Sequence, residues 1–255
     1  MDNLAFIIQA RLGSSRLPNK LILPFYKGKG IFQLLLDKLK SKYNNPIILA
    51  TSIHPENDKL VEIAKQAQVE IYRGDENNVL NRFISAAKQF QVKKIIRICS
   101  DNPFLDMEEL DSLMRFIQSN KYDYDYVSYN VNEKPSILSH FGFWTEYVKL
   151  EALEKTNQLI SDKYYQEHVT NYIYSHIDIF NIKLIDANDI TKGRNDIRMT
   201  LDTREDFDIL SEIYMNLSEK YGENRFGIKE LIEFIDLNEI KYRDRMVQQI
   251  RNNTK

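Results

Sequence analysis

The chain has 255 residues, 43% of them hydrophobic and 28% charged, a balance that suits one large α/β domain or one domain with a modest insertion. Its 35 basic and 37 acidic side chains leave a formal charge of −2, so no overall field favours nucleic acid or a membrane surface as a partner. One cysteine excludes an intramolecular disulfide, four scattered histidines are too few for a structural zinc site, and no targeting or membrane-spanning run is present, so we expect a cytoplasmic protein.

The first half of the chain alternates short apolar runs with amphipathic stretches. We expect strands at 4–9, 46–50, 69–72, 94–99 and 125–129, and helices at 31–43, 58–68, 79–90 and 107–120. This alternation indicates βαβ crossovers and an α/β fold with a mostly parallel, twisted sheet and helices on both faces. Functional residues then belong at the carboxyl ends of the strands, where such a sheet opens its crevice. Lys38, Lys40 and Lys42 are interpreted as a solvated helix end.

Beyond residue 122 the pattern loosens. The segment 122–197 contains helical runs at 147–154 and 164–175 and a strand at 180–185, and we interpret it as a smaller α+β insertion beside the crevice. A strand at 198–201, a helix at 205–217 and a polar helical tail follow. The expected organisation is one domain with three parts, about 1–121, 122–197 and 198–255.

The loop after the first strand combines a glycine, two serines and three cations. Gly13 permits a positive φ and a close approach to a ligand, and the amides and hydroxyls of Ser14 and Ser15 can donate to phosphate oxygens. The cations, spaced so that a curled loop brings them together, are Arg11, Arg16 and Lys20. The pattern indicates a cradle for a nucleoside triphosphate, and the alternative is a solvated surface loop.

Two carboxylates follow expected strands, Asp101 after 94–99 and Asp202 after 198–201. At the floor of the crevice such groups can hold a hard divalent cation, here Mg²⁺. The alternatives are a Ser-Asp-Asn-Pro turn at Asp101 and a helix cap at Asp202 or Thr203, with Asp206 at capping-box spacing. Two strand-end aspartates facing a cationic loop favour a single metal site.

This combination suits nucleotidyl transfer, in which an acceptor oxygen attacks the α-phosphorus of a nucleoside triphosphate and pyrophosphate leaves. Positioning and charge neutralisation lower the barrier, and no protein nucleophile is needed.

The run Tyr122 to Tyr126 offers a second interpretation. Its Asp123 and Asp125 form an Asp-x-Asp pair, which in a glycosyltransferase would bind metal and a sugar nucleotide. Alternating Tyr and Asp is also typical of a half-exposed edge strand, which we favour. His168 could contact an acceptor, or it could be a packed or capping residue.

Several blocks of the sequence resemble one family, the cytidylyltransferases related to spore-coat polysaccharide biosynthesis proteins, and more distantly the CMP-Kdo and CMP-sialic acid synthetases. The blocks lie at 8–11, 15–20, 73–75, 79–82, 97–103, 167–170 and 200–206. The resemblance covers about residues 4 to 210. It implies a GT-A-like nucleotide-diphosphosugar transferase fold, Rossmann-like in outline, with CTP as the nucleotide.

The resemblance also implies roles for individual residues. The catalytic set is Arg11, Lys20, Asp101 and Asp202, of which Asp101 and Asp202 would hold Mg²⁺. The nucleotide-binding set is Ala10, Arg11, Gly13, Ser14, Ser15, Arg16, Lys20, Arg73, Asn78 and Ser100, with Arg73 and Asn78 on the base side. Glu167 and His168 would contact the acceptor.

We therefore expect a Mg²⁺-dependent cytidylyltransferase that transfers CMP from CTP to a sugar, sugar acid or related small acceptor for surface-polysaccharide synthesis. The first part of the chain would bind the nucleotide and the 122–197 insertion the acceptor. The expected partners are these small molecules and a second copy of the chain in a homodimer. The alternatives are a glycosyltransferase that uses a sugar nucleotide and a nucleotide-binding module without catalysis.

Overall fold

The computed structural model describes residues 3–119 and 122–253, so the expected helix end at Asn120 lies outside the described residues. One eight-stranded sheet organises the chain, with the strand order β3-β2-β1-β4-β7-β5-β6 and with β8 paired to β5. The strands are β1 (Leu4–Gln9), β2 (Ile47–Ser52), β3 (Glu70–Gly74), β4 (Lys94–Cys99), β5 (Tyr126–Val131), β6 (Lys134–Pro135), β7 (Glu146–Lys149) and β8 (Ile182–Asp186).

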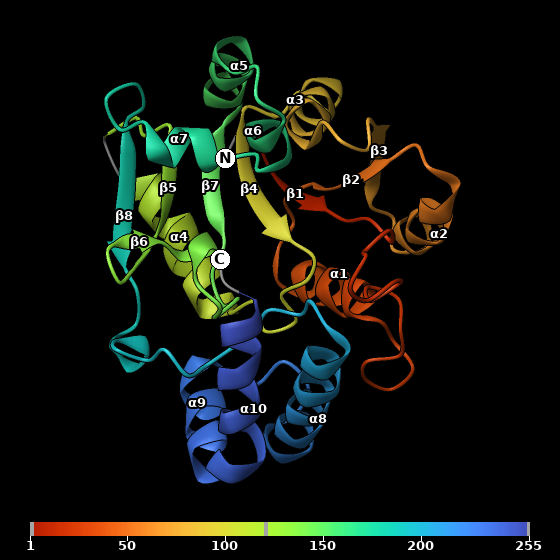
Figure 1. Cartoon of the computed structure of the whole chain (residues 1–255). Coiled ribbons are helices and arrows are strands. Elements are labelled where there is room, and N and C mark those ends of the chain that lie inside the picture. The colour runs from red at the N-terminus through yellow and green to blue at the C-terminus, as the bar shows by residue number, and fades with distance from the viewer. Residues whose placement is uncertain (1–2, 120–121, 254–255) are drawn as a thin grey trace.

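The sheet has a parallel half and a mixed half. Strands β1 to β4 pair in parallel, whereas β7 runs antiparallel to both β4 and β5, and β8 is parallel to β5. The carboxyl ends of β1 and β4 therefore lie together at one edge of the sheet (Figure 1), because Gln9 is in register with Cys99. The loops that leave these ends carry the candidate site.

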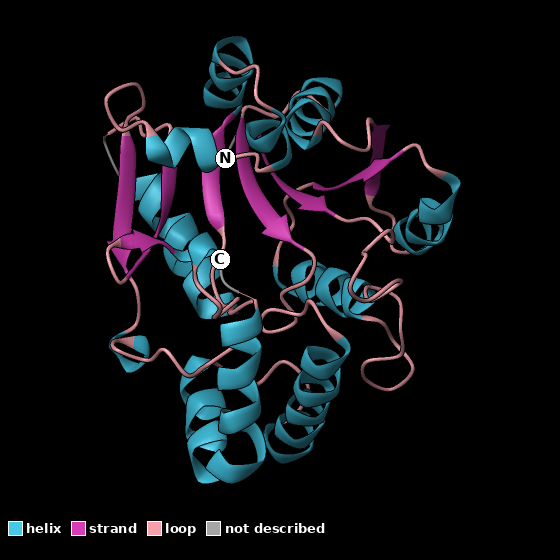
Figure 2. Ribbon diagram, viewed as in Figure 1, coloured by secondary structure: helices cyan, strands magenta, loops and turns pink. Residues whose placement is uncertain are grey.

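Helices cover both faces of the sheet (Figure 2). They are α1 (Ile31–Lys42), α2 (Asp58–Gln66), α3 (Val79–Gln89), α4 (Met107–Ser119), α5 (Leu150–Leu159), α6 (Lys163–Glu167), α7 (Asn171–Ser175), α8 (Arg204–Tyr221), α9 (Ile228–Leu237) and α10 (Glu239–Asn252). Short 3-10 helices lie at Pro55–Asn57, Ser136–Leu138 and Asp189–Thr191. In the described part of the chain, no helix combines the length and apolar character needed to cross a membrane.

Alternate residues of β1 enter two separate cores. Phe6 and Ile8 pack in the larger one with α1, α4 and the C-terminal helices, while Ala5 and Ile7 pack against α3, α5 and α7. Because successive side chains of a strand point to opposite faces, a strand covered on both sides needs apolar residues at every position. This explains why the early strands lack polar alternation and confirms the expected helix–sheet–helix layering.

Two expected elements of the later segment are wrong in part. Residues 147–149 belong to β7, and α5 begins only at Leu150, because Tyr147 and Val148 pair with both β4 and β5. The run 164–175 is two short helices, since the chain breaks at His168 with φ −97° and ψ 70°. Long-range strand pairing and loop closure overrode the helical pattern in both places.

The expected strand at 198–201 is also wrong. These residues belong to no strand; the amide of Met199 donates to the carbonyl of His140, and that of Leu201 donates to the carbonyl of Asp101. The segment thus crosses the end of the sheet, linking two loops. Asp202 consequently follows a crossing segment rather than a strand.

Two smaller expectations also fail. Lys38 is buried rather than solvated, and its ammonium donates to the carbonyl of Leu105 at 3.0 Å. The Tyr122–Tyr126 run is no edge strand, because only Tyr126 enters β5, where it is fully buried between neighbouring strands.

Candidate active site

The loop after β1 is shaped by a buried amide side chain. Asn57 accepts a hydrogen bond from the backbone N–H of Leu12 at 2.8 Å and donates to the hydroxyl of Ser52 at 2.8 Å. The left-handed residue of the loop is Asn19, with φ 60°, and not Gly13, so the expected positive φ at Gly13 is wrong. Gly13 is instead a close-approach position, because a Cβ there would lie 2.5 Å from Oε1 of Glu56.

Lys20, at the far end of this loop, joins the two aspartates. Its Nζ lies 3.3 Å from Oδ2 of Asp101 and 3.3 Å from Oδ1 of Asp202, and it donates to the carbonyl of Leu201 at 2.5 Å. The lysine is almost buried, so its charge is screened little by solvent. The structure therefore brings together three residues that the sequence singled out from the two ends and the middle of the chain.

Asp202 is held more tightly than Asp101. Its Oδ2 accepts from Arg198 at 2.9 Å and its Oδ1 lies 3.0 Å from Arg16. Arg198 is buried between this carboxylate and that of Asp206, and its Nε lies 2.8 Å from Oδ1 of Asp206. Burial lowers the pKa of Arg198, but hydrogen bonding and attraction to the two aspartates raise it above its ordinary value.

The helix cap predicted as the alternative for the 202–206 segment is also present. Thr203 caps α8 by accepting from the N–H of Asp206, while the carboxylate of Asp206 accepts from the N–H groups of Asp202 and Thr203 at 2.9 Å each. The capping box orients the start of α8 and, with it, the side chain of Asp202. Capping and convergence with Asp101 thus coexist.

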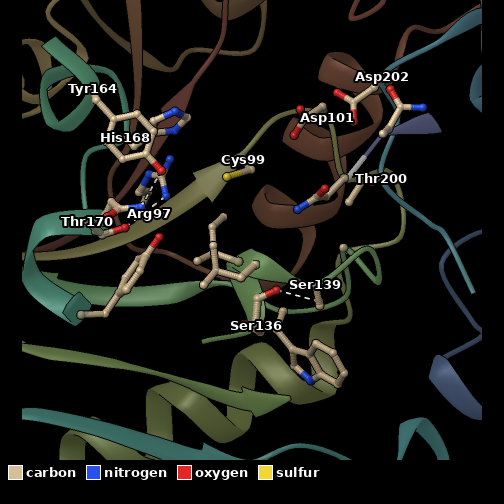
Figure 3. Close-up of a pocket in the computed structure, with 18 of the residues that line it drawn as sticks. Arg97, Cys99, Asp101, Ser136, Ser139, Tyr164, His168, Thr170, Thr200 and Asp202 are labelled. Carbon is tan, nitrogen blue, oxygen red and sulfur yellow. Dashed lines mark hydrogen bonds between the residues drawn. The ribbon is translucent and has the colours of Figure 1, made fainter. Parts of the chain in front are cut away.

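Two cavities meet at the aspartates. One, of about 510 Å³, is lined by the loop residues Ala10, Arg11, Gly13, Ser14, Ser15, Arg16 and Lys20, with Ser100 and Glu167. The other, of about 380 Å³, lies toward α7 and the short helix Ser136–Leu138 and is shown in Figure 3. The two share Arg16, Arg97, Cys99, Asp101, His168 and Asp202. A ligand in one cavity would therefore adjoin a ligand in the other across Asp101 and Asp202.

Sequence reasoning missed most of the second cavity. In Figure 3, Cys99 lies between the pair Asp101 and Asp202 on one side and Arg97 on the other. The remaining wall is mixed, because Ser136 and Ser139 lie beside the apolar side chains of Ile137, Leu138 and Trp144. The missed residues include Arg97, Cys99, Ser136, Ser139, Thr170 and Tyr174. The signal for Arg97 was a charge inside the apolar run 95–98, whereas the serines lie in a segment without periodicity.

Arg97 forms a buried ion pair at the inner end of this cavity. Its NH1 lies 2.6 Å from Oε1 of Glu146, which also accepts from Thr170 at 2.7 Å, while Tyr126 donates to Oε2 at 2.5 Å. Burial lowers the pKa of Arg97, but attraction to Cys99 and Glu146 outweighs it and raises the pKa. Because Thr170 lies in the break between α6 and α7, this network fixes the wall that carries His168.

The remaining candidates are distributed unevenly. His168 lines both cavities and packs against Tyr164, with the two ring centroids 4.6 Å apart. Glu167 lines only the loop-side cavity of the two and pairs with Arg11 at 3.4 Å.

Arg73 and Asn78 line neither cavity. Arg73 ties the 52–58 loop through Asp58 at 2.7 Å and the carbonyls of Ser52 and His54, and Asn78 caps α3. Their contact with a base stays a prediction.

The Asp123 and Asp125 pair lies at the opposite end of the sheet from the cavities. Nζ of Lys149 lies 2.6 Å from the carboxylate of Asp123 and 3.6 Å from that of Asp125. Lys149 is in register with Lys94 at the start of β4, whereas Asp101 follows the end of that strand. Asp123 is 85% exposed. The pair is thus a surface ion-pair group, remote from the aspartates that meet at Lys20.

The converging aspartates have the chemistry of a site for a divalent cation. Oδ2 of Asp101 and Oδ1 of Asp202 both approach one cationic group, so they define one cation position. Mg²⁺ is usually held by one or two carboxylates and completes its shell with phosphate oxygens and water. Within residues 3–119 and 122–253, no group of three or more His, Cys, Asp or Glu could hold a metal.

Comparison with known proteins places the chain in a family. Residues 5–238 match the model of a family described as Cytidylyltransferase. The chain is 36% identical to the Methanocaldococcus jannaschii protein MJ1063 over 91% of this chain and 90% of that one, and 29% identical to the spore coat polysaccharide biosynthesis protein SpsF of Bacillus subtilis over 86% and 90%. A Leptospira borgpetersenii cytidylyltransferase structure superposes with a TM-score of 0.81 at 27% identity, covering 94% of this chain and 97% of that one.

Proposed function

Because the chain belongs to the cytidylyltransferase family and is a nucleotidyltransferase, we propose that it transfers CMP from CTP to a sugar, sugar acid or related small acceptor, for surface-polysaccharide synthesis. One observation carries the proposal. Asp101 and Asp202, from distant parts of the chain, meet at the Nζ of Lys20 where two cavities join.

The loop-side cavity is proposed to hold CTP. Each loop cation has a carboxylate partner within the chain, Arg11 with Glu167, Arg16 with Asp202, and Lys20 with both aspartates. A triphosphate entering this cavity offers these cations stronger, multiply charged partners. The hydroxyls of Ser14 and Ser15, the backbone N–H of Ser15 and the nearby Ala10, Gly13 and Ser100 are proposed to line the phosphates, with Arg73 and Asn78 on the base side. The backbone N–H of Ser14 already donates to the carbonyl of Leu12 at 2.8 Å.

Asp101 and Asp202 would hold the Mg²⁺, which when bound would neutralise phosphate charge and orient the α-phosphate. Arg198 keeps Asp202 in the orientation that faces Asp101, through the 2.9 Å contact with Oδ2. Lys20, released from part of its contact with the aspartates, is positioned to stabilise negative charge on the departing phosphates.

The second cavity is proposed to hold the acceptor. An acceptor oxygen placed at its mouth attacks the α-phosphorus of CTP, the bond from that phosphorus to the bridging oxygen breaks, and pyrophosphate leaves with the bonding electrons. A hydroxyl acceptor loses its proton to solvent. His168, which lines both cavities, is proposed to contact the acceptor, whereas the pairing of Glu167 with Arg11 supports a place nearer the nucleotide.

The test is a product assay. The protein is incubated with each nucleoside triphosphate, Mg²⁺ and a panel of sugars, sugar acids and sugar phosphates, and pyrophosphate and the CMP conjugate are measured. We expect pyrophosphate release with CTP and one acceptor class, lost in Asp101→Ala. Absence of any CTP-dependent product across the panel, together with no shift in melting temperature on adding CTP and Mg²⁺, would contradict the proposal.

A further inference from the structure

Two arginines of helix α10 form ion pairs with residues on either side of Asp202 in the chain. Arg243 pairs with Asp196 at 2.7 Å, before the crossing segment, and Arg245 pairs with Glu205 at 2.5 Å, in the first turn of α8. Tyr242 and Met246 of the same helix are buried in the larger core. In Figure 1, α10 runs from the α8 and α9 layer toward the sheet. The helix is thus placed to bring its last residues to the aspartates.

The end of α10 closes a ring of contacts with the candidate site. The hydroxyl of Thr203 donates to Oε1 of Gln249 at 3.1 Å, and Asn253 donates through Nδ2 to the carbonyl of Gln249 at 2.9 Å. The other side of the same amide, Oδ1 of Asn253, accepts from NH1 of Arg16 at 2.7 Å. NH2 of Arg16 then contacts Oδ1 of Asp202 at 3.0 Å, and Asp202 adjoins Thr203 in the chain. We call these five residues the contact ring.

The amide chemistry of Asn253 suits this position. Its NH₂ group faces a helix carbonyl and its oxygen faces a guanidinium, so both ends of the amide are matched and its orientation is determined. Asn253 also lines the acceptor-side cavity. Arg16 is 52% exposed and unbranched, so it loses considerable rotamer freedom when it is ordered. Two directed contacts on the two NH₂ groups of one guanidinium hold it in a single orientation.

We propose that Asn253, oriented by Gln249, is a positioning residue that holds Arg16 beside Asp202 in readiness for the phosphates of the nucleotide. The inference rests on the proposed function for its purpose, but the contact ring exists without nucleotide and can be tested without it. It adds the end of α10, which lies outside the matched family region of residues 5–238, to the active site.

Nucleotide binding provides the first test. The dissociation constant for CTP with Mg²⁺ is measured by calorimetry for the wild type, Asn253→Ala, Arg16→Ala and the double variant. We expect Asn253→Ala to weaken binding about fivefold, the loss of one hydrogen bond to a half-exposed charged group. In the Arg16→Ala background the same substitution should change nothing, because Asn253 acts through Arg16. Asn252→Ala, at the exposed neighbouring position, is the matched control and should bind CTP like the wild type.

A merely structural role predicts a different result. If Asn253 only stabilises α10, Asn253→Ala should lower the free energy of unfolding and weaken CTP binding equally in both backgrounds, which would overturn the inference. Unchanged CTP affinity in Asn253→Ala would overturn it as well.

The second test needs no nucleotide. Hydrogen exchange of a peptide covering residues 12–19 is compared between Asn253→Ala and Asn252→Ala in the free protein, and we expect about twofold faster exchange in the former, because the loop has lost one of its anchors. Equal exchange would overturn the inference. If the wild type fails to bind CTP, the proposed function fails, while this comparison still decides whether Asn253 holds the loop.

Discussion

Replacing each of the two converging aspartates by asparagine should separate their effects on binding from their effects on stability. Both side chains contact Lys20, but their surroundings differ. Asp202 is 13% exposed and contacts Arg16, Lys20 and Arg198, whereas Asp101 is 38% exposed and forms an ion pair with Lys20. We expect both variants to lose Mg²⁺-dependent CTP binding, and only one to lose much stability.

The magnitudes follow from the contacts. An ion pair at about 3 Å is worth roughly 5 kcal/mol at an effective dielectric constant of about 20, and desolvation cancels a large part of this value. Asp202→Asn leaves the buried Arg198 with one carboxylate fewer, so we expect a loss of roughly 2–3 kcal/mol in the free energy of unfolding. Asp101→Asn weakens a partly exposed pair while Lys20 keeps its contact with Asp202, so the loss should stay below about 1 kcal/mol.

Urea denaturation and thermal denaturation followed by circular dichroism, near neutral pH and without Mg²⁺, measure the stability difference, and calorimetry with CTP and Mg²⁺ measures binding. The melting temperature should fall by about 4–10 °C in Asp202→Asn and by less than about 4 °C in Asp101→Asn. Equal stability losses in the two variants would refute the reasoning about Asp202 and Arg198. Wild-type CTP affinity in either variant would remove that residue from the proposed metal site.

Three further predictions concern the framework of the site. Glu146→Gln leaves the buried Arg97 without its carboxylate partner and should lower the free energy of unfolding by about 3–5 kcal/mol in urea denaturation, whereas a loss below about 1 kcal/mol would contradict a buried pair. Burial lowers the pKa of Lys38 from 10.5 to about 8, so Lys38→Met should be more stable than the wild type at neutral pH. That advantage should shrink by up to about 3 kcal/mol as the pH rises from 8 to 10.5, because the folded wild type then loses a proton that its unfolded chain still binds; a constant difference would contradict the shift. Gly30→Ala should destabilise the protein by more than about 2 kcal/mol, because the new Cβ would lie 2.5 Å from a backbone oxygen. Gly13→Ala meets only the end of a flexible side chain and should cost less than about 1 kcal/mol. Equal melting temperatures of the two variants would contradict this difference.

Much of the parallel half of the fold could be predicted from the sequence. The apolar runs at 4–9 and 94–99 coincide with β1 and β4, and the helix expected at 79–90 differs from α3 by a single residue. These elements have strong local signals, because a strand buried on both faces is continuously apolar and an amphipathic helix repeats its apolar residues every three to four positions. The βαβ alternation predicts a crevice at the carboxyl ends of the strands, and it predicts that Asp101 lies in this crevice.

The mixed half depends on contacts that no local pattern encodes. β7 is a strand because it fits between β4 and β5, and the break at His168 accompanies the hydrogen bond from Thr170 to Glu146. A window of neighbouring residues contains neither partner, so its helical periodicity was misleading there.

The sequence by itself determined the cationic loop, the capping box at Thr203 and the two candidate carboxylates, of which only Asp101 follows a strand. Only the tertiary structure decided that these carboxylates meet at Lys20, that Arg97 is neutralised by Glu146, and that Asn253 reaches Arg16. The physical reason is that capping and loop chemistry act between residues a few positions apart, whereas each of these pairs joins segments separated by about fifty to more than two hundred residues. Their proximity results from the packing of the whole sheet and of the helices on it.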